Sequence, residues 1–300
     1  MSGPIASWLA DGRRLHLNHG PIDLIVEAFG QEQERLLAYR QAVARFETIL
    51  EELVAELPAL RSPAGARLRR FCGATAQRME RVAHAHVPAF VTPMAAVAGS
   101  VADDVLAALV KDRALAWAYV NNGGDVAIHL ADGETLDIAI AGTGHGMDDR
   151  ISVRSGDAVR GIATSGWRGR SHSLGIADAV TVLAPSAAAA DVAATLIANE
   201  VDLPGHPAVE RVPASRIDPD SDLRDRLVTQ AVGSLSHADI TLALDNGLVT
   251  AQAMHERGVI EAAALFLRGE TRECGTIPLE KRMQETAFGY CDSQEGLIHA

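Results

Sequence analysis

Two oxygen-bearing side chains, Asp191 and Thr195, interrupt an apolar, alanine-rich run over residues 187–198. Their i, i+4 spacing places both on one face of the helix that this run predicts. A carboxylate and a hydroxyl at that spacing can supply two hard oxygen ligands to Mg²⁺, leaving other positions to water and phosphate. The alternative is that Asp191 complements the dipole of its own helix N-terminus while Thr195 packs, and spacing alone favours this alternative.

Two polar segments between predicted strands have residue types that suit a ligand. Residues 121–125, Asn-Asn-Gly-Gly-Asp, are typical of a tight hairpin turn, yet paired glycines also let a ligand approach the backbone closely. Residues 164–172 combine Thr-Ser-Gly at a strand end with two arginines and a histidine. Such a loop can present backbone N–H groups, hydroxyls and cations to a phosphate. An ordinary polar turn is the alternative for this second segment.

The surrounding pattern predicts the elements that must position these residues. Short alternating runs between residues 115 and 184 predict a mostly antiparallel sheet, and a further hairpin is predicted over residues 13–29. Helices are predicted from residue 31 to about 57, where Pro58 ends the first, then over roughly 65–84 and after Thr92-Pro93. A capped helix near 220–232, another near 247–256 and a strand over 259–267 complete the pattern.

The chain shows no low-complexity linker, so the elements predict one α+β domain over residues 1–300. In this domain a mostly antiparallel sheet packs against helices. The hairpin and long helix occupy about residues 10–60, and a polar, irregular tail occupies about residues 270–300.

Composition and charge narrow the classes of partner. A net charge of −12 argues against a broad contact with a nucleic-acid backbone, and no membrane span or signal peptide is apparent. Three cysteines without C-x-x-C spacing predict reduced thiols. His84 and His86 fall at a predicted helix end, which favours surface histidines over metal ligands. We expect a soluble, cytoplasmic protein with a small-molecule ligand, and a homo-oligomer is left open.

Four segments together resemble the ApbE superfamily of flavin transferases, most closely its cytoplasmic branch. They are "TPMAAVAGSVADDV", "NNGGDVAI", "IATSG" followed by a histidine, and "AVTVLAPSAAAADVAATLIA", in the order and approximate spacing of that superfamily. The resemblance covers roughly residues 10–270. It implies an ApbE-like, T-fold-like architecture that binds FAD or a related nucleotide with Mg²⁺.

The resemblance also implies a role for individual residues. It implies that Mg²⁺ is held by Asp191, Thr195 and a backbone carbonyl near Val97. It implies a flavin or nucleotide pocket formed by Asn122, Gly123, Gly124, Asp125, Thr164, Ser165, Gly166 and His172. To this pocket we add Arg168 and Arg170 as cations for a phosphate. Asp125 and His172 are the candidate catalytic groups, as proton carriers.

The sequence departs from the transferases at two places. Ala98 precedes Gly99 where they have a lysine, and the segment after His172 runs directly into the next strand instead of continuing as "His-x-x-Asp-Pro-x-Thr-Gly". Two functions therefore stay open. One is a Mg²⁺-dependent enzyme that hydrolyses or transfers at the pyrophosphate of a flavin or related nucleotide. The other is a non-catalytic accessory or ligand-sensing protein, which would suit the link between this branch and sulfide assimilation toward homocysteine.

A third function, a hydrolase with a Ser165, His172 and Asp178 triad, is disfavoured. The sequence has no G-x-S-x-G motif to place a serine nucleophile on a sharp strand-to-helix turn.

Overall fold

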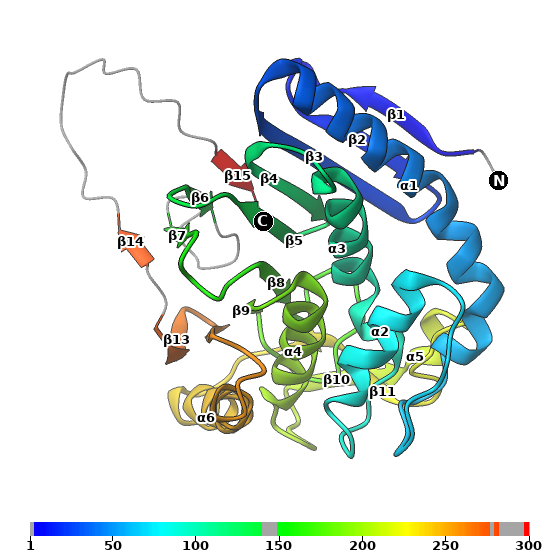
Figure 1. Cartoon of the computed structure of the whole chain (residues 1–300). Helices are drawn as coiled ribbons and strands as arrows, with labels where there is room; N and C mark the ends of the chain where they lie inside the picture. The colour runs from blue at the N-terminus through cyan, green and yellow to red at the C-terminus, as the bar shows by residue number, and fades with distance from the viewer. Residues whose placement is uncertain (1–2, 140–148, 277–278, 282–296, 300) are drawn as a thin grey trace.

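The main element of the fold is a nine-stranded sheet in which every pair of neighbours is antiparallel (Figure 1). The computed structural model describes residues 3–139, 149–276, 279–281 and 297–299. In order across the sheet the strands are β1 (Ile5–Trp8), β2 (Leu15–His19), β3 (Ile22–Gly30), β4 (Leu115–Asn122), β5 (Asp125–Leu130), β8 (Gly161–Ser165), β9 (Ala179–Ala184), β12 (Ala262–Leu267) and β13 (Glu270–Gly275). The predicted α+β class with a mostly antiparallel sheet is confirmed.

Helices cover one face of this sheet (Figure 1). They are α1 (Glu32–Leu60), α3 (Val97–Val110) with the preceding 3₁₀ turn η1 (Pro93–Ala96), α4 (Ala187–Glu200) and α6 (His237–Glu256). Helix α2 (Ala74–His84) packs on α1, α3 and α4. Buried apolar residues of α1 and α3 pack on β2 to β5, and those of α4 and α6 pack on β8, β9 and β12. The two apolar helices α3 and α4 thus pack side by side on the same face of the sheet.

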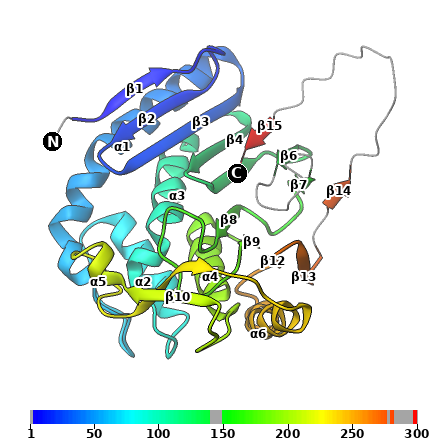
Figure 2. The same cartoon turned by 180° about the vertical axis from the view of Figure 1, so that it is seen from behind.

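The opposite face of the nine-stranded sheet packs against a second, smaller sheet (Figure 2). Its strands are, in order, β14 (Leu279–Lys281), β7 (Asp149–Arg154), β6 (Thr135–Ala139) and β15 (Leu297–His299). We expected the strands between residues 115 and 184 to form one sheet, and for β6 and β7 that prediction is wrong. Alternation shows that a strand has one buried face, but it does not show against which sheet that face packs.

Several element boundaries also differ from the prediction. Helix α1 continues through Pro58 to Leu60, since a proline removes one N–H donor while Arg61 still donates to the carbonyl of Leu57. Helix α2 begins at residue 74 rather than near 65. Much of the helix predicted over 220–232 is instead strand β11 (Leu227–Val232), paired with β10 (Val209–Pro213), after the one-turn helix α5 (Ala214–Ile217).

The C-terminal prediction holds only in part. Residues 270–275 form strand β13 rather than the start of an irregular tail, and most of the segment after residue 276 lies outside the described residues. Cys72 and Cys274 are free, as expected, and Cys291 also lies outside the described residues.

The stretch Pro93–Val110 is long and apolar enough to cross a membrane, but 61% of it is buried inside the fold. Burial of that extent is typical of the core helix of a soluble protein.

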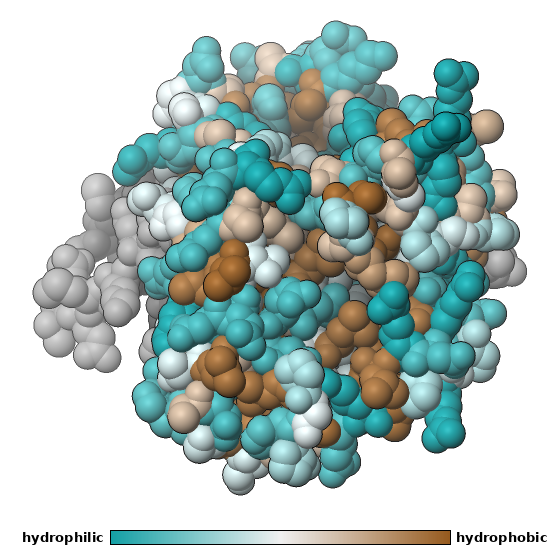
Figure 3. Space-filling model, turned by 90° about the horizontal axis from the view of Figure 1, so that it is seen from below, coloured by the Kyte–Doolittle hydropathy of each residue, from teal (hydrophilic) through white to brown (hydrophobic). Residues whose placement is uncertain are grey.

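On the side of the molecule seen in Figure 3, hydrophobic residues lie in several groups that hydrophilic residues separate.

Candidate functional site

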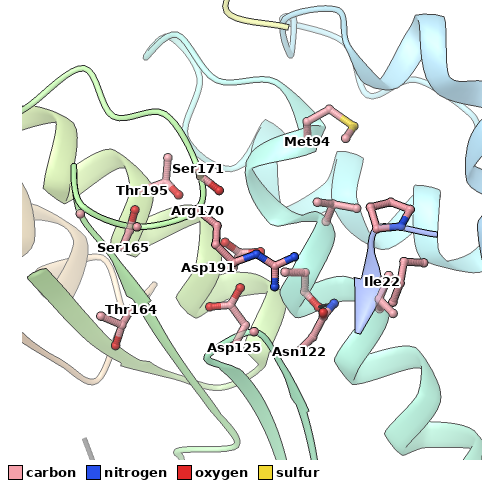
Figure 4. A pocket seen from close by; sticks show the side chains of 17 residues that line it. Ile22, Met94, Asn122, Asp125, Thr164, Ser165, Arg170, Ser171, Asp191 and Thr195 are labelled. Carbon is pink, nitrogen blue, oxygen red and sulfur yellow. Dashed lines mark hydrogen bonds between the residues drawn. The ribbon is translucent and has the colours of Figure 1, made fainter. Parts of the chain in front are cut away.

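A cavity of about 450 Å³ lies where the N-terminal turn of α3, the middle of α4 and three inter-strand turns meet (Figure 4). The β2–β3 turn, η1 and α3 form a largely apolar wall, and the β4–β5 turn, the end of β8 with its following loop, and α4 form a polar one. The lining residues are Pro21, Ile22, Met94, Val97, Ala98, Val101, Asn122, Gly123, Asp125, Thr164, Ser165, Gly166, Gly169, Arg170, Ser171, Asp191 and Thr195.

Most of the site residues predicted from the sequence line this single cavity, although they come from four separate segments. Gly124, Arg168 and His172 are not among the lining residues. The roles of all these residues toward a ligand stay predictions.

Asp191 holds the N-terminus of the neighbouring helix. Its Oδ2 accepts the backbone N–H of Gly99 at 2.9 Å, in the first turn of α3. The exchange is reciprocal, because the carboxylate of Asp103 in α3 accepts the N–H groups of Ala187 and Ala188 at the start of α4, at 3.1 and 3.0 Å. Each helix thus supplies an acceptor to N–H groups at the start of the other helix, where those groups have no partner within their own helix. The dipole that Asp191 complements is that of α3, and not that of its own helix as our alternative supposed.

The two helices touch at Gly99. A Cβ atom at this position would lie 2.3 Å from the carbonyl oxygen of Ala187, a distance that only glycine permits. This close crossing brings the first turn of α3, including Val97, beside Asp191. That a carbonyl near Val97 joins Asp191 and Thr195 as a metal ligand stays a prediction.

A second carboxyl group, that of Asp125, lies near Asp191 in the cavity wall (Figure 4). Burial and the charge of Asp191 raise the pKa of Asp125 well above its usual range, against a lowering contribution from the backbone N–H of Thr164. Burial, with a smaller contribution from Asp103, raises the pKa of Asp191 to about 7, although the backbone N–H groups of Gly99 and Ala98 oppose the rise. Near neutral pH the pair therefore retains a proton.

Two side chains that were predicted to bind a ligand form hydrogen bonds between the elements of the cavity wall. The hydroxyl of Thr164 forms a hydrogen bond with that of Thr181 on the neighbouring strand, at 2.9 Å. The Asn122 amide donates to the carbonyl oxygen of Ala98 at 3.0 Å, and so ties the β4–β5 turn to α3.

The two arginines of the β8–β9 loop have different surroundings. Arg170 lines the cavity and lies against the β4–β5 turn, since a Cβ on Gly123 would be 3.1 Å from its Nη1. Arg168 instead pairs with Asp178 at 3.2 Å, and its guanidinium lies over the Trp167 ring. Of the two arginines predicted to hold a phosphate, Arg170 is the one that lines the cavity.

The structure gives no support to the hydrolase triad. The Asp178 carboxylate accepts from Trp167 Nε1 and from the backbone N–H of Arg268, besides its pair with Arg168. Its partners in the described part of the chain do not include His172, the residue that a triad requires.

Of the two histidines at the end of α2, His86 departs from its predicted surface position, whereas His84 is half-buried. His86 is only 5% exposed, and burial, with a smaller effect of Arg257, lowers its pKa to about 4. His84 forms a hydrogen bond with the carbonyl of Gly65 at 2.9 Å. Across the residues that the structure describes, no group of three or more His, Cys, Asp or Glu side chains is placed to hold a metal ion.

Sequence reasoning missed the apolar wall of the cavity. Pro21 and Ile22 come from the β2–β3 turn, far away in sequence, and nothing local marks them as site residues. Met94 and Val101 belong to "TPMAAVAGSVADDV", one of the four segments that carry the family resemblance, so this local motif could have indicated them as site residues. Ser171 lies within the predicted ligand-binding loop of residues 164–172, although the prediction did not include it among the site residues.

Comparison with known proteins gives a family and no activity. The family model described as "AbpE bacteria" matches residues 6–273. A UPF0280 protein of Methanopyrus kandleri is 36% identical over 170 residues, which is 56% of this chain and 66% of that protein. UPF0280 proteins of Methanosphaerula palustris and Methanosarcina acetivorans are 38% and 36% identical, over 41% and 40% of this chain and 52% and 47% of their own lengths. The matches thus span about half to two thirds of these relatives.

Proposed function

We propose that this chain, which belongs to the family described as "AbpE bacteria", binds a flavin or related nucleotide together with Mg²⁺ in the cavity between α3 and α4. One observation carries the proposal. The hard oxygen donors of Asp125, Asp191 and Thr195, the cation of Arg170 and an apolar wall all line one cavity of a size typical of small-molecule sites. As a location we propose the cytoplasm.

The donor set of the cavity fits Mg²⁺. This ion prefers oxygen ligands and is usually held by one or two carboxylates, with water and phosphate at the other positions. Asp191 and Thr195 lie one turn apart on α4, and Asp125 comes from the β4–β5 turn. Because burial and the charge of Asp191 raise the pKa of Asp125, a dication held by Asp191 would compensate a negative charge that the fold otherwise neutralises with a proton.

The remaining lining suits the two ends of a nucleotide. Pro21, Ile22, Met94 and Val101 offer an apolar surface to a planar ring. Arg170, with the hydroxyls of Ser165 and Ser171, offers a cation and hydrogen-bond donors to a phosphate.

Turnover at a pyrophosphate is a second step of the proposal. When bound, Mg²⁺ would supply Lewis-acid stabilisation of charge on a phosphoryl oxygen. On the chain itself, Asp125 is the candidate for exchanging a proton with the ligand, while Asp191 and Thr195 would hold the ion.

One observation favours the alternative of a non-catalytic accessory or ligand-sensing protein. His172, the other candidate proton carrier, is not among the lining residues.

The test is FAD binding by isothermal titration calorimetry with and without Mg²⁺, on the wild type, Asp191→Asn and Thr195→Val. An asparagine can still accept the N–H of Gly99 but carries no charge for a dication, so the helix cap is kept and the metal ligand is lost. We expect Asp191→Asn to weaken Mg²⁺-dependent binding by roughly tenfold or more, about 1.4 kcal/mol. Thr195→Val should weaken it less, since a neutral hydroxyl is removed.

Asp103→Asn is the matched control. Asp103 caps α4 as Asp191 caps α3, but it is not among the residues that line the cavity. Because Asp103 makes only a small contribution to the pKa of Asp191, Asp103→Asn should change FAD and Mg²⁺ binding far less than Asp191→Asn does. Mg²⁺-dependent binding that survives intact in Asp191→Asn would refute the metal assignment, and a wild type that binds neither FAD nor a nucleotide would refute the ligand class. Detection of hydrolysed FAD in the same samples would separate turnover from binding.

A further inference from the structure

The two edges of the nine-stranded sheet are built differently. The strand β13, at one edge, carries the charged residues Glu270, Arg272 and Glu273, and α6 packs against it. Charged side chains and a covering helix are the usual protection of an edge against pairing with another strand. The strand β1, at the other edge, has the uncharged sequence Ile-Ala-Ser-Trp, and all four of its residues are exposed. Its outer N–H and C=O groups have no neighbouring strand in the described sheet.

A groove of about 460 Å³ runs beside this unprotected edge, between β1 and α1. Trp8 forms part of one wall, where its ring meets that of Tyr39 edge to face at a centroid distance of 4.9 Å. Leu36 and Val43 belong to the other wall. Ile5, Trp8 and Leu36 are 55%, 49% and 47% exposed, which makes this edge an apolar surface open to water.

The helix wall of the groove carries one charge of each sign. Arg40 and Glu47 lie two turns apart on α1, on either side of Val43 and Ala44. Neither forms an ion pair with a residue in the described ranges of the chain. In a two-fold arrangement centred between them, Arg40 of one copy would face Glu47 of the other, and the pair would form twice. The surface is therefore complementary in charge to itself.

We propose that β1 and the Leu36–Glu47 stripe of α1 form the interface of a homodimer. In this dimer the two β1 strands pair antiparallel about a two-fold axis, which continues the sheet from one copy into the next. Ile5 lies opposite Trp8 of the second copy in this pairing, and the apolar groove is closed. A second copy is the occupant that fits, because the surface combines an unpaired strand edge with opposite charges related by the same two-fold.

The test is the mass of the full chain in solution, measured by sedimentation equilibrium and light scattering over a range of concentrations. The wild type should be a dimer that dissociates on dilution. Ile5→Lys and Leu36→Glu should each raise the dissociation constant by roughly tenfold or more, because every substitution enters a two-fold interface twice. Val249→Glu on α6, where the replaced side chain is 66% exposed, is the matched control and should leave the mass unchanged.

A charge exchange tests the two-fold geometry itself. R40E and E47R alone should each weaken the dimer, since each places like charges opposite one another. The double variant R40E/E47R should restore it, because the ion pairs form again with their signs reversed. A wild type that stays monomeric at every concentration would overturn the proposal. So would a dimer whose dissociation constant is the same in Ile5→Lys, Leu36→Glu and the control, because another surface would then form it.

Discussion

The carboxylate of Asp191 has two neighbours of different kinds, the backbone N–H of Gly99 and the carboxyl group of Asp125. The first contact is structural, since it satisfies a free donor at the start of α3. The second neighbour is affected in turn, because the charge of Asp191 raises the pKa of Asp125 in the cavity wall. A substitution at Asp191 therefore alters both the fold and the cavity, and only a variant that keeps the acceptor oxygen separates the two.

Variants of Arg170 and Arg168 test whether Arg170 binds the phosphate of a ligand in the cavity. Arg170→Ala should weaken binding of a nucleotide by roughly ten- to a hundredfold, because a charge-assisted hydrogen bond is worth about 1.5–3 kcal/mol. The melting temperature should change little, since Arg170 is exposed. Titration of FAD or ADP into each variant measures the effect.

Arg168→Ala is the control for this prediction, because Arg168 pairs with Asp178 away from the cavity lining. We expect nucleotide affinity within about twofold of the wild type in this variant. Equal losses of affinity in the two variants would contradict the separation that the structure draws between them.

His86 gives a prediction for the dependence of stability on pH. Its pKa is about 4 in the fold, against the usual 6.5 of a histidine, because burial disfavours the charged ring. The unfolded chain therefore takes up a proton at a higher pH than the folded chain. The stability that this difference contributes is present above about pH 6.5 and is lost as the pH falls toward about 4, by up to about 3 kcal/mol.

Urea unfolding of the wild type and of His86→Gln at about pH 7, 5.5 and 4.5 checks this expectation, since these values span the range over which the two states differ in bound protons. The variant should lose less free energy of unfolding over that range than the wild type, whatever its stability at neutral pH. Parallel curves for the two proteins would show that His86 is not the group responsible.

At the scale of elements, the crossing of α3 and α4 decides where the cavity lies. Gly99→Ala would place a methyl group 2.3 Å from the carbonyl oxygen of Ala187, so the helices must separate. Overpacking costs about 1–3 kcal/mol. The helix propensity of alanine returns about 1 kcal/mol. Because the obstacle is backbone, which cannot rotate away, the cost should lie in the upper part of this range, so we expect a net loss of about 1–2 kcal/mol in the free energy of unfolding.

Denaturant unfolding of Gly99→Ala beside Gly156→Ala measures this loss. Gly156 lies in an exposed turn, and a methyl group added there would have no atom within 4 Å beyond those of Gly156 and its two chain neighbours. Its substitution should therefore change the free energy of unfolding by no more than about 0.5 kcal/mol. A Gly99→Ala protein as stable as the wild type would mean that the helices do not touch as described.

At the scale of the whole molecule, the cavity lies on the helical side of the nine-stranded sheet, where the groups of elements around α3 and α4 meet. The chain carries a net charge of −12, and among the residues that line the described cavity Arg170 is the one cation. An anionic ligand therefore approaches against the overall charge, and its retention has to depend on Arg170 and a bound dication rather than on long-range attraction.

The sequence by itself determined the local elements that carry the site. The alanine-rich run over residues 187–198 predicted α4, and Ser186, directly before it, caps the helix by accepting the N–H of Ala189. The i, i+4 spacing then placed Asp191 and Thr195 on one face. The Asn-Gly-Gly turn and the strands beside it were equally legible, because turn residues and alternation are properties of neighbouring residues.

Only the tertiary structure decided how these segments meet. That Asp191 caps α3, that Asp125 lies beside it, and that Pro21 and Ile22 complete the cavity all depend on contacts between residues far apart in sequence. The same holds for β6 and β7, whose alternation is like that of β4 and β5 although they form a different sheet. Local pattern fixes which face of an element is buried, whereas the partner of that face is chosen by packing over the whole chain.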